Sequence, residues 1–91
     1  MQNWACCFDD QPNNARPVLI TIVYKYSDRP STPIVGCYYK EPDDYGRHDW
    51  IFLEHINDVS KCMSVEDMKK FGLCYYWQEL PDNSFLRYPL D

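Results

Sequence analysis

The chain has no long apolar run, no cluster of basic residues and only three glycines. No apolar stretch approaches the roughly 18 residues that cross a membrane as a helix, so we expect no transmembrane segment. The N-terminus lacks the basic start and apolar core of a secretion signal, which predicts a cytoplasmic protein. The missing Lys/Arg cluster argues against direct nucleic-acid binding, and the scarcity of glycine argues against a phosphate-binding loop.

The short motifs that mark common enzymes are also missing, among them the nucleophile elbow, the zinc-protease helix and the P-loop. The five cysteines include no C-x-x-C pair and show no ligand spacing typical of structural zinc. We therefore predict no catalytic residue, no metal and no cofactor. An alternative, a hydrolase that uses cysteine or a metal, would depend on Cys6, Cys7, His48 and His55. Free cysteines are more often small buried apolar side chains.

The length of 91 residues fits one domain. We divide residues 1–91 into an N-terminal segment (1–16), a core of sheet and helix (17–81) and a tail (82–91). The net charge is −5, and the carboxylates are scattered among Lys and Arg as on a solvated surface. Aromatic residues make up 16% of the chain, enough to fill a core and leave rings exposed.

Four segments rich in β-branched and aromatic residues predict strands: 18–26, 34–40, 48–55 and 73–80. The first strand is apolar on both faces, which predicts a central position. Loops of about seven residues join the first three strands, so an antiparallel meander is expected. Gly36 in the second strand indicates a bulge or a close backbone approach.

Residues 64–72 predict the one helix. Ser64 is an N-cap with Asp67 at the capping-box distance, and Gly72 fits a helix stop. Val65, Met68 and Phe71 are expected to share the face that docks on the sheet. The predicted fold class is therefore α+β, a small antiparallel sheet of about four strands with one short helix packed on it.

The densest polar cluster, which runs from Asp43 to Asp49 and includes Arg47, reads as a solvated hairpin turn. Glu54 and His55 end the third predicted strand, where alternation sends them to opposite faces.

Two aromatic runs, Tyr38-Tyr39 and Tyr75-Tyr76-Trp77, lie in predicted strands. Alternation turns one ring of each strand outward, and neighbouring strands would join these rings into a surface patch. In the alternative, the helix or the Trp4 segment covers that face and the rings belong to the core. The candidate partner-binding residues are Tyr38, Tyr39, Asp43, Asp44, Tyr45, Tyr75 and Trp77.

The order of these pieces resembles a family of short proteins of unknown function found in bacteriophage and prophage genomes. That family opens with a W-I-x-V-x-x-x-L-P-like segment, has a G-Y-Y-like second strand and a Trp in the third, and closes with H-W-x-P-L-P. The similar segments here are residues 4–12, 17–23, 35–39, 49–52 and 76–81. This chain departs from the pattern at Gln11, Tyr76 and Glu79, where the family has Leu, His and Pro. The Tyr76 departure argues against any role that needs a histidine there.

The resemblance implies a phage or prophage accessory protein and carries over no catalytic residue. We therefore expect a phage-encoded protein that binds and inhibits a host protein in the host cytoplasm, in the manner of anti-defence or anti-CRISPR inhibitors. Its partner would be a host protein, with no membrane or direct nucleic-acid contact. A homodimer formed through an edge strand is a further alternative. One alternative is a structural or accessory phage protein. Another is a sponge for a small nucleotide signal, bound through arginines such as Arg16, Arg29, Arg47 and Arg87.

Overall fold

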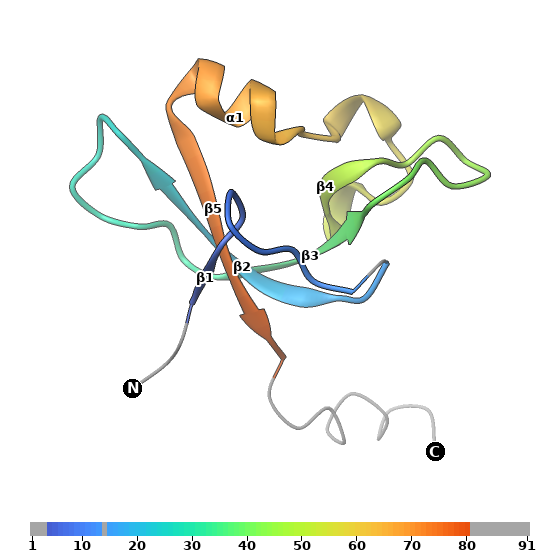
Figure 1. Ribbon diagram of the computed structural model, residues 1–91, viewed down its shortest axis with the longest axis horizontal. Coiled ribbons are helices and arrows are strands. Elements are labelled where there is room, and N and C mark those ends of the chain that lie inside the picture. The colour runs from blue at the N-terminus through green and yellow to red at the C-terminus, as the bar shows by residue number, and fades with distance from the viewer. Residues whose placement is uncertain (1–3, 14, 81–91) are drawn as a thin grey trace.

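A mainly antiparallel β architecture is seen in the computed structural model, which describes residues 4–13 and 15–80 (Figure 1). The strands are β1 (Ala5–Cys6), β2 (Val18–Tyr24), β3 (Ile34–Tyr39), β4 (Asp49–Phe52) and β5 (Leu73–Glu79). The helices are α1 (Val65–Phe71) and two short 3-10 turns, η1 (Leu53–His55) and η2 (Val59–Lys61). The α+β class is confirmed, with five strands in place of about four, because the short apolar start of the chain forms β1. The predicted tail, 82–91, lies outside the described residues.

The strand order in the sheet is β1-β5-β2-β3-β4, with every neighbouring pair antiparallel. The predicted meander is confirmed for β2, β3 and β4, and β2 is the central strand. After α1, the chain returns through β5, which enters the sheet between β1 and β2. Seven residue pairs join β2 to β5, from Val18–Glu79 to Tyr24–Leu73, so this contact is the longest in the sheet.

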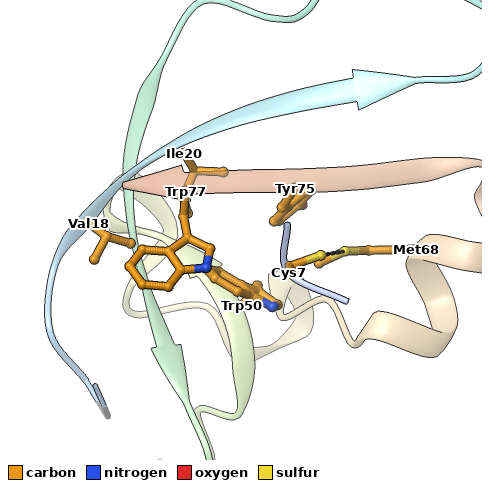
Figure 2. Close-up of a cluster of buried hydrophobic side chains, with 7 residues drawn as sticks. All are labelled: Cys7, Val18, Ile20, Trp50, Met68, Tyr75 and Trp77. Atoms are coloured by element: carbon orange, nitrogen blue, oxygen red, sulfur yellow. Dashed lines mark hydrogen bonds between the residues drawn. The ribbon is translucent and has the colours of Figure 1, made fainter. Parts of the chain in front are cut away.

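The main core lies on the face of the sheet that α1 covers. Its buried side chains come from β2, β4, β5, α1 and the residue that follows β1. They are Cys7, Val18, Ile20, Trp50, Met68, Tyr75 and Trp77 (Figure 2). Trp50 is fully buried and its ring lies 5.0 Å from that of Tyr38 and 6.0 Å from that of Tyr75. Burial of large apolar side chains such as Ile20 stabilises the fold by about 1.5–3 kcal/mol each.

The helix begins and ends where the sequence predicts. The Ser64 hydroxyl accepts a hydrogen bond from the backbone N–H of Asp67, and Gly72 closes α1 with a left-handed φ of 75°. Met68 is buried, but the prediction for Phe71 is wrong, because its side chain is 55% exposed. Side chains three residues apart on a helix differ in direction by about 60°. Phe71, the last of the three predicted positions, therefore points away from the face on which Met68 meets the sheet.

Beyond Phe52 the chain leaves the sheet, so the prediction of a strand through residue 55 is wrong. Leu53–His55 forms the 3-10 turn η1, and the side chains of Glu54 and His55 approach to 3.8 Å. This turn brings Ile56 back against the far face of the sheet. There Ile56 and Cys62 pack on a second buried cluster, formed by Cys37, Tyr39 and Ile51.

Candidate functional site

The loop between β3 and β4 is built around one carboxylate. Oδ1 of Asp43 accepts hydrogen bonds from the backbone N–H groups of Tyr45 (3.0 Å) and Arg47 (2.8 Å). Oδ2 accepts from Nε of Arg47 at 2.7 Å. Gly46 adopts a φ of 86° and donates its N–H to the Asp43 carbonyl at 3.0 Å. Partial burial raises the pKa of Asp43, but the hydrogen bonds from Arg47 and Tyr45 outweigh it, so the net pKa is below the ordinary value.

The guanidinium of Arg47 is held between two tyrosine rings. Its central carbon lies 5.5 Å from the centroid of the buried Tyr39 ring and 4.9 Å from that of Tyr45. Nη1 also donates to the carbonyl of Ile56 at 3.4 Å, which ties the loop to the segment after η1. Tyr45 remains 77% exposed on this support. A cation–π contact at an exposed site contributes about 0.5–1 kcal/mol, which favours the ring position over the guanidinium.

A hollow of about 510 Å³ opens beside this ring, lined by Tyr45, Arg47, Ile56, Asn57 and Val59. We call these residues, with Asp43 and Asp44, the hairpin corner. In Figure 1 the loop projects from the sheet next to the yellow segment that carries η1 and η2. Exposed carboxylates flank the lining residues in the sequence: Glu41, Asp44, Glu54 and Asp58. The hairpin corner therefore combines an exposed ring with an acidic rim.

The structure separates the predicted partner-binding residues into two groups. Tyr39, Tyr75 and Trp77 are buried, and Tyr38 is half-buried against Trp50. Their rings form no joint surface patch because they pack into the two buried clusters. Only the loop residues of the set, Asp43, Asp44 and Tyr45, come together at a surface.

Sequence reasoning placed Arg47 in the polar cluster but did not assign it or Ile56, Asn57 and Val59 to a partner surface. The spacing of Asp43 and Arg47, four residues apart around Tyr45 and Gly46, carries a local signal for the salt bridge. No local pattern indicates that residues 56–59 fold against this loop.

A second group of exposed aromatic side chains surrounds the C-terminal end of α1. It consists of Phe8, Tyr24, Tyr26 and Phe71 together with Lys25, Lys69 and Lys70, and we call it the helix-end patch. The rings of Tyr24 and Tyr26 meet edge to face at 5.1 Å, and Nζ of Lys25 lies 4.9 Å above the Tyr26 ring. Its charge is opposite to that of the hairpin corner.

In the described part of the chain, the two histidines considered for catalysis pair with carboxylates of adjacent residues, and the two cysteines contact sulfur atoms of distant residues. Nδ1 of His48 lies 2.7 Å from Oδ2 of the adjacent Asp49, whereas Cys7 is buried against Met68. Within residues 4–13 and 15–80, no three His, Cys, Asp or Glu side chains gather as a metal site would require. For a nucleotide sponge, Arg16 is paired with Glu79 at 3.0 Å and Arg47 with Asp43, so both cations already face carboxylates. Arg87 lies outside the described residues.

Comparison of this chain with protein-family models, with curated proteins and with solved structures finds no match. The resemblance to the phage family therefore stays a prediction. In the described part of the chain, no helix is long and apolar enough to cross a membrane.

Proposed function

We propose that this protein binds another protein through the hairpin corner and thereby inhibits it. The observation that carries the proposal is the exposed ring of Tyr45, held over the Arg47 guanidinium by the hydrogen bonds of Asp43. Tyr and Arg are the residue types that contribute most binding energy in protein interfaces. A side chain whose bound position is already favoured loses less entropy when it binds, and the contact with Arg47 favours one position of this ring.

The rim of the hairpin corner defines the chemistry of the partner. Four exposed carboxylates, Glu41, Asp44, Glu54 and Asp58, outnumber the two exposed lysines of the same segment, Lys40 and Lys61, so a partner surface that presents Lys or Arg is complementary. The exposed side chain of Val59 supplies part of the apolar surface of the hollow. An interface of standard size covers about 800 Å² per partner, which requires contacts on this rim as well as in the hollow.

Inhibition of a host protein is the biological setting that the phage-family resemblance supports. The chain lacks common catalytic motifs, so occupation of a partner's surface is a simpler route to a biological effect than chemistry. The proposal of a host protein as target rests on the resemblance, whereas the choice of the hairpin corner as the binding surface rests on its geometry.

The test is affinity capture from bacterial lysate with wild-type protein and two matched variants. Tyr45→Ala removes the proposed anchor, and Tyr26→Ala removes a ring of the helix-end patch that is equally exposed, at 73% against 77%. We expect one stoichiometric host protein with the wild type and with Tyr26→Ala, and its loss with Tyr45→Ala. With that partner purified, the dissociation constant should rise about 30-fold or more for Tyr45→Ala.

The opposite pattern, with binding lost only in Tyr26→Ala, would move the interface to the helix-end patch and refute the assignment. Capture of no host protein by the wild type would refute the inhibitor proposal itself. Melting curves of both variants establish that each is folded before binding is compared.

A further inference from the structure

The edge strand β1 carries a thiol that faces a thiol of its neighbour. Sγ of Cys6 lies 3.5 Å from Sγ of Cys74. In the β1–β5 ladder Cys6 is opposite Tyr76, so Cys74, two residues earlier, projects from the same face of the sheet. A disulfide bond is about 2.05 Å long, so the two sulfur atoms need to approach each other by about 1.5 Å.

Two features of the fold make this approach feasible. β1 has two residues and stands at the edge of the sheet, so it can shift without disturbing a strand on its outer side. Cys6 and Cys74 are both half-buried, which leaves a path for a small oxidant. A third thiol next to this pair, Cys7, is fully buried and donates to Sδ of Met68 (Figure 2).

We propose that Cys6 and Cys74 are a redox-active pair that peroxide converts to an intramolecular disulfide, which fastens β1 to β5. The sulfur of Cys6, as thiolate, attacks one peroxide oxygen, breaks the O–O bond and becomes a sulfenic acid, while the other oxygen leaves as water. The thiol of Cys74 then attacks that sulfur, gives up its proton and displaces a second water. Two thiols lose two electrons and two protons, and one hydrogen peroxide is reduced to two waters.

The order of the two steps follows from the surroundings of Cys74. Burial, followed by the hydrogen bond with Cys6, raises the pKa of Cys74 to about 12, so this thiol keeps its proton and the first attack belongs to Cys6. Oxidation of Cys6 removes that thiol–thiol hydrogen bond and the repulsion between two thiolates. The burial of Cys74 persists, so its proton passes to the sulfenic oxygen as the S–S bond forms and leaves in the second water.

The experiment treats the whole protein with hydrogen peroxide and counts the free thiols with a maleimide reagent under denaturing conditions. The wild type should fall from five free thiols to three, with a mass loss of about 2 Da in the monomer. The melting temperature of the oxidised protein should rise by about 5 °C or more, because the bond closes a loop between residues 68 positions apart. Dithiothreitol should reverse both changes.

Three serine variants identify the pair. Cys6→Ser should retain its four remaining thiols under peroxide, and Cys74→Ser should lose only the Cys6 thiol, as a sulfenic acid with a mass gain of about 16 Da and no disulfide, whereas the control Cys62→Ser should still lose two. Cys62 is a suitable control because it is also half-buried but lies after β4, away from this pair. Melting curves before oxidation confirm that each variant is folded.

Several results would overturn the assignment. One is a wild type that keeps all five thiols under peroxide. Another is a disulfide that still forms in Cys6→Ser, which would show that a pair without Cys6 reacts. A third is a bond found only between chains. The proposal does not rest on partner binding, since β1 and the hairpin corner lie at opposite edges of the sheet.

Discussion

Gly36 provides a direct test of how tightly the sheet and core are packed. It lies in β3, opposite Val18 of β2 and Phe52 of β4. A Cβ atom at this position would stand 2.6 Å from Cδ1 of Ile20 and 2.9 Å from the backbone oxygen of Ile51. The close backbone approach that the sequence predicted is therefore confirmed, and Gly36→Ala is the perturbation that measures it.

The net effect is a balance of two terms. Overpacking a dense core typically costs about 1–3 kcal/mol, and here one of the two close atoms is backbone that cannot rotate away. Replacing glycine by alanine also restricts the unfolded chain, which favours folding by about 0.4–1 kcal/mol. We expect the steric term to dominate and the free energy of unfolding to fall by about 1–2 kcal/mol.

Urea unfolding, followed by the fluorescence of the buried Trp50 and Trp77, is the assay. With an m-value of about 1 kcal/mol/M, the midpoint for Gly36→Ala should fall by about 1–2 M. The control is Gly46→Ala, where the nearest atom would be 3.8 Å away and only the φ of 86° opposes the change. The control should lose about 1 kcal/mol, since a left-handed backbone is its only penalty.

A double-mutant cycle then identifies the atom responsible. Ile20→Val removes Cδ1, the closest atom, at a cost of about 0.5–1.5 kcal/mol by itself. In combination with Gly36→Ala the two losses should sum to less than their separate values, with a coupling of about 0.5–1 kcal/mol. Strict additivity, or an unchanged midpoint for Gly36→Ala, would refute the steric account.

Two further predictions concern the helix and the hairpin corner. Met68→Ala should lower the free energy of unfolding by about 2–5 kcal/mol, whereas Phe71→Ala should change it little, because Met68 is buried and Phe71 is exposed. Equal losses for the two variants in thermal or urea unfolding would contradict the observed helix face. Since the folded-state pKa values of Asp43 and Asp58 are lowered, the stability they contribute is present above the ordinary carboxyl pKa of about 4 and is lost as the pH falls through the folded values. Asp43→Asn should flatten the decline of the urea midpoint between neutral pH and pH 3, and an unchanged slope would contradict the role of the Arg47 hydrogen bonds.

The elements whose bounds are set by residues close together in the sequence could be predicted. The predicted strand at 73–80 and the helix at 64–72 match β5 and α1 to within one residue at each end, because composition, the Ser64 cap and Gly72 act locally. The end of β4 could not be predicted from the sequence, because η1 is stabilised by a tertiary contact of Ile56 with the second buried cluster. The position of β5 between β1 and β2 likewise depends on pairing between distant segments.

The candidate site follows the same division. The turn around Asp43 could be recognised from the residue types of the loop, and Tyr45 in it was named. The hollow could not be predicted, because three of its five lining residues come from the segment 56–59, which only the turn after β4 brings beside the loop.

The alternation of side chains along a strand predicts the face on which an aromatic ring lies, but not whether that face is covered. Alternation correctly places Tyr38 and Tyr39 on opposite faces of β3, yet both faces of this sheet are covered at that point. Trp50 and α1 cover the first face, and the segment that carries η1 and η2 covers the second. Near β3, an exposed ring therefore comes from the loop that projects beyond both covers, so that Tyr45 is exposed while the buried Tyr39 contacts the same Arg47 guanidinium.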